Sequence, residues 1–117
     1  MADYQEAMYL KFLSSQQAAV RLDLALNGFF SEDGFTAQQK QAFADYLKTR
    51  VRPALQSMIE QENTDRIQRM DVLGWMNASV VEDGLLYAMR QRKTQGFLCL
   101  LKIKSEKYGF HDRNLDW

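Results

Sequence analysis

Apolar residues recur along most of the chain at spacings of three to four positions, with charged and polar residues between them. This spacing is typical of amphipathic α-helices. Over residues 3–27 it predicts one long helix, which Gly28 would end because glycine accepts a left-handed conformation at no steric cost. The apolar positions of this helix are Met8, Phe12, Val20, Leu22 and Leu26.

Thr36 and Gln39 mark the start of the next helix. They have the spacing of a capping box, in which each side chain satisfies a free backbone group of the other residue. Pro53 is compatible with a kink or with the first turn of a new helix, and we expect a new helix. The inner faces of these two helices would carry Phe43, Leu47, Val51, Leu55, Met58 and Ile59.

Three more helix starts follow in the second half of the chain. Asn63 is a candidate N-cap for the first of them, and Ser79–Glu82 has the spacing of a second capping box. The last of the three helices would begin at about Thr94. Gly74 and Gly109 would occupy the left-handed positions that end two of these helices. The apolar positions of the three helices are Ile67, Met70, Leu73, Leu85, Leu86, Met89, Phe97, Leu100, Leu101 and Ile103.

The composition favours the same class of fold, because one proline and six glycines in 117 residues leave few helix breakers. A strand over residues 97–104 is the alternative, but it would have no partner strand elsewhere. We predict an all-α protein of about six helices in a single domain, residues 1–117. Residues 1–52 would form an N-terminal helical pair or cap, residues 53–110 two helical hairpins, and residues 111–117 a polar tail.

The second half of the chain repeats its apolar pattern with an offset of 30 residues. Asn63 falls on Lys93, and both residues lie at a turn between two short helices. The apolar positions that superpose are Ile59 on Met89, Ile67 on Phe97, Met70 on Leu100 and Leu73 on Ile103. Each unit would be a helical hairpin followed by a loop.

Within this repeat, Ala88-Met89, Arg92-Lys93, Phe97 and Leu100-Leu101 follow one another in an order that resembles the helix–turn–helix part of an ankyrin repeat. The resemblance covers roughly residues 53–109. It implies two stacked hairpins, with the N-terminal helices as a divergent cap. The sequence departs from the family at the turn glycine, which is Glu62 or Arg92 here, and it lacks the Thr-Pro-Leu-His opening.

The chain offers little for catalysis. His111 and Cys99 are the one histidine and the one cysteine, which are too few for a zinc site, and a nucleophilic pair would need the tail to fold back on Cys99. The acid pairs fit helix ends and turns, and the scattered glycines form no phosphate-binding loop. We therefore expect no enzymatic activity, no catalytic residue, no metal site and no cofactor.

The charges balance overall, with 15 Lys and Arg against 15 Asp and Glu. This argues against bulk electrostatic binding to nucleic acid or to a membrane. Residues 90–107 nevertheless hold six bases and one acid, so a nucleic-acid-associated protein is an alternative function. Such a cluster is also typical of the solvated outer face of a helical hairpin.

Binding to another protein is the function that this architecture favours. Tryptophan is enriched at binding hot spots. Trp75 falls in the expected loop between the two hairpins, and Trp117 is the last residue of the polar tail. A homodimer, or a small regulatory or inhibitor protein acting as a dimer, is an alternative. No signal segment or spanning helix is visible, so a cytoplasmic location is expected. The expected partner-binding residues are Trp75, Met76, Arg66, Arg69, Arg90, Arg92 and Trp117.

Overall fold

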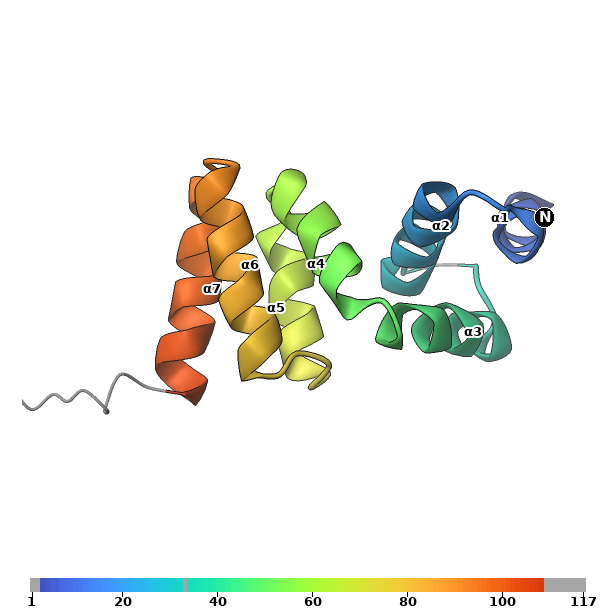
Figure 1. Ribbon diagram of the computed structural model, residues 1–117. Helices are drawn as coiled ribbons and strands as arrows, with labels where there is room; N and C mark the ends of the chain where they lie inside the picture. Colours follow the sequence, from blue (N-terminus) through green and yellow to red (C-terminus); the bar gives the residue numbers. More distant parts are fainter. Residues whose placement is uncertain (1–2, 33, 109–117) are drawn as a thin grey trace, which may run out of the picture. The chain divides into compact units, whose positions relative to one another are not determined.

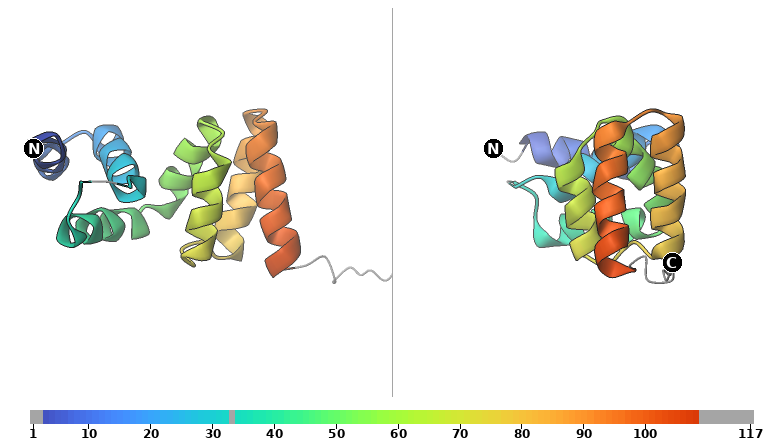
Figure 2. Two further views of the ribbon diagram at one scale, coloured as in Figure 1. Left: turned by 180° about the vertical axis from the view of Figure 1, so that it is seen from behind. Right: turned by 90° about the vertical axis from the view of Figure 1, so that its left-hand side faces the viewer.

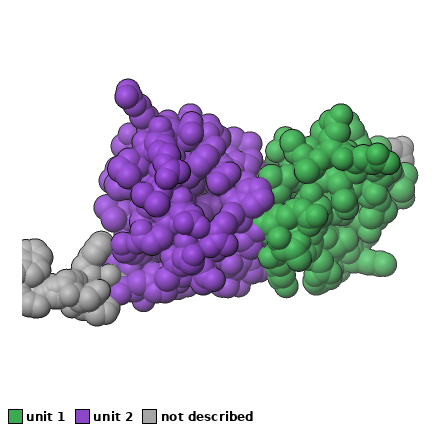
Figure 3. Space-filling view, in the orientation of Figure 1, with its two compact units in different colours: residues 1–50 green, residues 51–117 purple. Residues whose placement is uncertain are grey.

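The computed structural model describes residues 3–32 and 34–108, which form seven α-helices and no strand (Figure 1). The predicted all-α class is confirmed, and the helix count is seven where about six were expected. The chain divides into two compact units, residues 1–50 and residues 51–117, each described here by itself (Figure 3). The helices are α1 (Asp3–Ser14), α2 (Ala18–Phe30), α3 (Ala37–Lys48), α4 (Val51–Glu60), α5 (Thr64–Val72), α6 (Ala78–Arg90) and α7 (Thr94–Lys107).

The extra helix arises because the long helix expected over residues 3–27 is broken after Ser14. The backbone N–H of Gln17 donates to Ser15 Oγ at 3.2 Å. A serine hydroxyl that bonds the nearby backbone competes with the helical hydrogen bonds. The apolar spacing continues across the break, so periodicity alone did not reveal it.

Gly28 does not end α2, contrary to expectation, because the helix runs on to Phe30. The glycine is buried inside the helix, and a Cβ added to it would lie 2.3 Å from Phe43 Cε2. The missing side chain therefore lets α2 approach the aromatic core of unit 1. In that core the ring of Phe12 meets the rings of Phe43 and Tyr46 edge to face, with ring centroids 5.0 and 5.3 Å apart.

The capping box at Thr36 is confirmed. Thr36 Oγ1 accepts the backbone N–H of Gln39 at 3.0 Å, and Gln39 Oε1 accepts the backbone N–H of Thr36 at 3.0 Å. Pro53 lies in the first turn of α4, as expected for a new helix. Its missing N–H costs nothing there, because the first backbone donors of a helix have no partner within it.

Unit 2 consists of two helical hairpins, α4 with α5 and α6 with α7. The hairpins pack on each other through the pairs α4–α6 and α5–α7. The end-on view of Figure 2 shows α7 between α5 and α6. Gly84 of α6 supports the close packing, because an added Cβ would lie 2.7 Å from Leu55 Cδ2. The core of unit 2 is built from Ala54, Leu55, Met58, Ile59, Ile67, Met70, Met76, Val80, Val81, Leu85, Ala88, Leu100 and Ile103.

Two of the four helix-end signals expected in this half are present. Asn63 Oδ1 accepts the backbone N–H of Arg66 at 3.2 Å, and Gly74, with φ at +78°, follows α5. The capping box predicted at Ser79–Glu82 is wrong, because Asn77 Oδ1 caps α6 one residue before it begins. The other expected stop, Gly109, lies outside the described residues.

The two hairpin turns of unit 2 have the same backbone geometry. Glu62 and Arg92 adopt the left-handed conformation, with φ of +51° and +57°. The following residue, Asn63 or Lys93, donates its N–H to the carbonyl five positions earlier, at 2.9 and 2.8 Å. This is the Schellman pattern. The helices flanking the turns end at residues 60 and 90 and begin at residues 64 and 94, so the offset of 30 residues recurs in the backbone.

Some apolar residues expected on inner faces are on the surface. Leu73, Leu86 and Met89 are 45, 42 and 57% exposed, and Phe97 and Leu101 are only partly buried. Leu73 directly follows α5. The other four residues lie on α6 and α7, on a side that no other described part of unit 2 covers. Within the described part of the chain, no helix combines the length and the apolar character needed to span a membrane.

Candidate protein interaction surface

Apolar side chains gather on the side of α6 and α7 that no described helix of unit 2 covers. Leu86 and Met89 lie three positions apart on α6, and Phe97 and Leu101 lie four positions apart on α7, so each pair shares one helix face. Leu86 and Met89 are exposed, and Phe97 and Leu101 are half-buried. We call these four residues the outer apolar surface.

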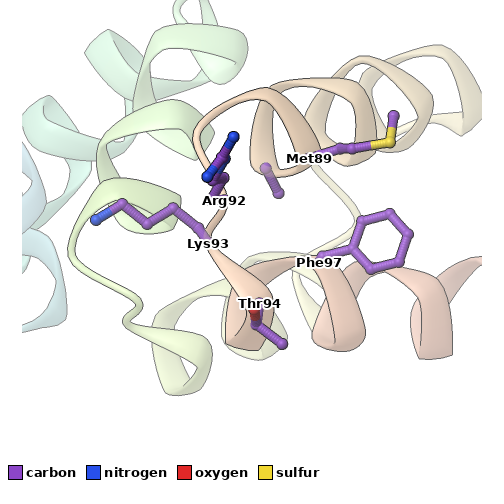
Figure 4. Close-up of a pocket in the computed structure, with 6 residues that line it drawn as sticks. Met89, Arg92, Lys93, Thr94 and Phe97 are labelled. Carbon is purple, nitrogen blue, oxygen red and sulfur yellow. The ribbon is translucent and has the colours of Figure 1, made fainter.

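A hollow of about 370 Å³ opens at one end of this surface, beside the turn that joins α6 to α7. We call it the turn hollow. Figure 4 shows that the side chains of Met89 and Phe97 lie next to each other, whereas Lys93 points the opposite way. The lining residues are Ala88, Met89, Arg92, Lys93, Thr94 and Phe97.

The corresponding face of the first hairpin is covered. Ile59 and Ile67, which stand 30 positions before Met89 and Phe97, are both 0% exposed. The covering element is the second hairpin, since an added Cβ at Gly96 of α7 would lie 3.3 Å from Ile59. The second hairpin thus presents apolar residues at the two positions where the first hairpin is buried by its neighbour.

The basic cluster of residues 90–107 is partly neutralised in the fold. Lys93 Nζ lies 3.9 Å from Glu60 Oε1, and Lys107 Nζ lies 3.1 Å from Asp71 Oδ1. Lys104 forms an ion pair with Glu82. Half of the six bases are therefore next to acids of α4, α5 and α6. The remaining bases, Arg90, Arg92 and Lys102, are exposed.

The structure separates the residues that the sequence grouped as a partner site. Arg90 and Arg92 lie at the turn that follows α6, whereas Trp75 lies in the loop that precedes it. A 13-residue helix stands between them, which corresponds to about 20 Å. Met76 is 4% exposed and belongs to the core of unit 2. Trp117 lies outside the described residues.

The two predicted arginines of α5 lie at different ends of the helix, Arg66 in its first turn and Arg69 in its last. Arg69 pairs with Asp65 at 3.3 Å on the same helix. Burial, together with the neighbouring Arg69, lowers the pKa of the Arg66 guanidinium. These two side chains therefore belong to α5, whereas Arg90 ends α6 and Arg92 lies in the turn after it.

Cys99 lies on α7 with a half-buried thiol, 3.9 Å from the carbonyl oxygen of Thr64. Burial raises the pKa of this thiol, and a hydrogen bond from Gln68 opposes the rise only in part. A raised pKa reduces the thiolate fraction, which is the nucleophilic form. His111, its conceivable partner, lies outside the described residues.

In residues 3–32 and 34–108, no group of three or more His, Cys, Asp and Glu side chains could hold a metal ion. Comparison of the chain with protein-family models, curated protein sequences and solved structures gave no significant match. The outer apolar surface is thus defined by its geometry alone. The sequence led to an expectation of an apolar end on a two-hairpin stack, as a ground for a homodimer, but none of these four residues was among the expected partner-binding residues.

Proposed function

We propose that this protein is a non-enzymatic interaction module that binds another protein through the outer apolar surface. One observation carries the proposal. Met89 is exposed and Phe97 is only half-buried, whereas their counterparts one repeat earlier, Ile59 and Ile67, are fully buried. A partner helix or helical hairpin would cover the second hairpin as the second hairpin covers the first.

The finer part of the proposal concerns the architecture. The matched turns at Glu62 and Arg92, and the packing of α4 on α6 and α5 on α7, support a repeat of two ankyrin-like hairpins. Stacked repeats bury a continuous core only when each exposed end is covered. The apolar surface of the second hairpin is such an end, and a partner protein could cover it.

The energetics of the surface suit reversible binding. Full burial of a leucine, methionine or phenylalanine side chain is worth roughly 1.5–3 kcal/mol. Leu86 and Met89 retain about half of their surface for a partner to bury. Because part of this gain offsets the lost freedom of the two molecules, the surface needs several anchors that act together.

Nucleic-acid binding is less favoured by the same structure. Contacts to phosphates require lysines and arginines that are available to the ligand, and three of the six bases in residues 90–107 lie beside acids. A homodimer through the outer apolar surface is a special case of the proposal, in which the partner is a second copy of the chain.

The test compares two double variants of the full chain. Leu86→Glu with Met89→Glu places two charges on the outer apolar surface, at side chains that are already largely exposed. Gln95→Glu with Ser105→Glu adds the same charge at exposed positions of α7 that are not part of the surface. Each tagged protein is used for affinity capture from native lysate, with nuclease, at two salt concentrations, and captured proteins are quantified.

The proposal expects a stoichiometric protein that the unmodified chain and the Gln95→Glu, Ser105→Glu control retain. The Leu86→Glu, Met89→Glu variant should capture at least tenfold less of that protein, which corresponds to a loss of about 1.4 kcal/mol in binding free energy. Capture of untagged copies of the chain itself, with the same loss, would identify a homodimer. Equal capture by all three proteins would overturn the proposal, as would capture of nucleic acid alone that washes off at high salt.

A further inference from the structure

We propose that the partner of the outer apolar surface is a helix of a second protein that begins with an acid, and that this acid lies against Arg90. The inference rests on the proposed function, because it gives the chemistry of the partner at the same surface. The guide is the contact between the two hairpins of unit 2, in which the second hairpin covers the first.

In that contact, a base at the start of the covering helix faces an acid at the end of the covered one. Lys93, the N-cap residue of α7, has its Nζ 3.9 Å from Oε1 of Glu60, the last residue of α4. Tyr87 of α6 donates a hydrogen bond to the same carboxylate. The second hairpin thus contacts the end of α4 through one charged and one polar side chain.

Three positions after that base, the covering helix carries a residue without a side chain. A Cβ added to Gly96 would lie 3.3 Å from Ile59 Cγ2, and Ile59 is 0% exposed. A side chain larger than a methyl group would therefore have to displace Ile59. The contact combines a charged pair with a close approach of the helix.

The corresponding positions of the second hairpin carry the opposite charge. Arg90, the last residue of α6, stands 30 positions after Glu60. Arg92 stands 30 positions after Glu62, in a turn of the same backbone geometry. Both arginines are exposed, and Arg92 lines the turn hollow together with Met89. The second hairpin therefore repeats the apolar position of the first and reverses the charge beside it.

A covering helix that starts with an acid fits these arginines, whereas one that starts with a base, as α7 does, would not. Like charges that face each other across an interface cost free energy and exclude wrong partners. An acid at the start of a helix also caps that helix and interacts favourably with its dipole. The partner helix would place an aspartate against Arg90 and a glycine or alanine, three positions later, over Met89.

The same charges disfavour a second copy of this chain as the covering protein. If the second hairpin of another copy stacked in this register, its Lys93 would lie against Arg90. The first hairpin of another copy would bring Asn63, which stands 30 positions before Lys93 and is neutral. Neither hairpin supplies the acid, so the structure favours a different protein.

The probe is a phage-displayed library of single-helix peptides. Its N-cap position is aspartate or lysine, the position three residues later is alanine, and the rest of one face varies among apolar residues. Aspartate caps helices better than lysine in any peptide. The readout is therefore the change in the aspartate-to-lysine ratio from one bait protein to another.

The charge-reversed bait is the full chain with Arg90→Glu and Arg92→Glu. Glutamates stand at the corresponding positions of the first hairpin, so this fold accepts them at such a turn. The control bait, Lys11→Glu with Lys48→Glu, makes the same change of charge at exposed lysines of unit 1. Urea unfolding verifies that each bait is folded.

Only peptides that the Leu86→Glu, Met89→Glu variant fails to capture are counted, because these bind the outer apolar surface. Among them, the ratio should be at least about threefold lower with the charge-reversed bait than with the unmodified chain, as exposed charge pairs would give. The control bait should leave the ratio unchanged.

Equal ratios with the charge-reversed bait and the unmodified chain would overturn the inference and leave the proposed function standing. Recovery of no peptide that binds the surface would also overturn the inference, and the capture experiment then decides the proposed function separately. Sedimentation equilibrium supplies the last outcome. A dimer of the unmodified chain that the Leu86→Glu, Met89→Glu variant abolishes would identify the partner as a second copy, against the inference.

Discussion

Gly84 of α6 lies so close to Leu55 of α4 that a Cβ at residue 84 would come within 2.7 Å of Leu55 Cδ2 and 3.0 Å of Leu100 Cδ1. Leu55 and Leu100 are themselves 2 and 0% exposed. Neither side chain has room to move away, because protein interiors are packed as densely as organic crystals. The two hairpins of unit 2 therefore meet at a glycine that no other residue can replace without strain.

We expect Gly84→Ala to destabilise the protein. Overpacking a filled core typically costs about 1–3 kcal/mol, against a gain of up to about 1 kcal/mol from the helix propensity of alanine. Gly96→Ala is the matched control, because its added Cβ would lie 3.3 Å from one branch of Ile59. Urea unfolding should show a lower midpoint for Gly84→Ala than for Gly96→Ala. Equal midpoints would contradict the close contact.

The left-handed turns allow a stabilising substitution. Arg92 adopts φ of +57°, a conformation that costs residues other than glycine roughly 1–2 kcal/mol. We expect Arg92→Gly to stabilise the fold by about 0.5–1 kcal/mol once the entropy cost of glycine is subtracted. Gln91→Gly, at φ of −87°, should destabilise it instead. Thermal unfolding measures both, and the same sign for both variants would refute the explanation.

Local signals were sufficient to predict much of the fold. Thr36 with Gln39, Asn63 and Gly74 acted as the sequence predicted, because each needs only backbone groups within three or four positions. The same local reasoning failed at Gly28. That glycine is read as a helix stop along the chain, whereas its role is set by Phe43 of another helix.

The candidate site was harder to predict, because it depends on which faces remain uncovered. Met89 and Phe97 have the apolar character of core residues, and nothing local shows that no described helix packs over them. The partner-binding residues expected from the sequence were chosen by residue type, as tryptophans and arginines that are common at binding surfaces. Trp75 and Arg92 then proved to lie at opposite ends of one helix, a separation that follows from placing the helix boundaries.

A tyrosine on α6 should report the contact between the hairpins. Tyr87 Oη donates a hydrogen bond to the Glu60 carboxylate, which raises the pKa of Tyr87. A raised pKa in the folded state means that this contact stabilises the fold below the ordinary tyrosine range and is lost as the pH rises through the raised pKa. Glu60→Gln should bring the pKa of Tyr87 back down.

Absorbance titration at alkaline pH measures this change. The chain has five tyrosines, so the signal of residue 87 is isolated as the difference between each protein and its Tyr87→Phe counterpart. The late-titrating component should be present in the unmodified protein and absent in Glu60→Gln. Its persistence in Glu60→Gln would show that the carboxylate is not the cause.

The thiol of Cys99 should react slowly in the folded protein. Burial raises its pKa, so at neutral pH a smaller fraction is thiolate than in an exposed cysteine, and the half-buried sulfur is also less accessible. Labelling with a disulfide reagent should be slow near pH 7, should accelerate as the pH rises beyond the ordinary range of a thiol, and should reach the rate of a free cysteine in urea. Labelling in buffer as fast as in urea would mean that α7 opens readily at Cys99, which the burial of Leu100 and Ile103 on the same helix argues against.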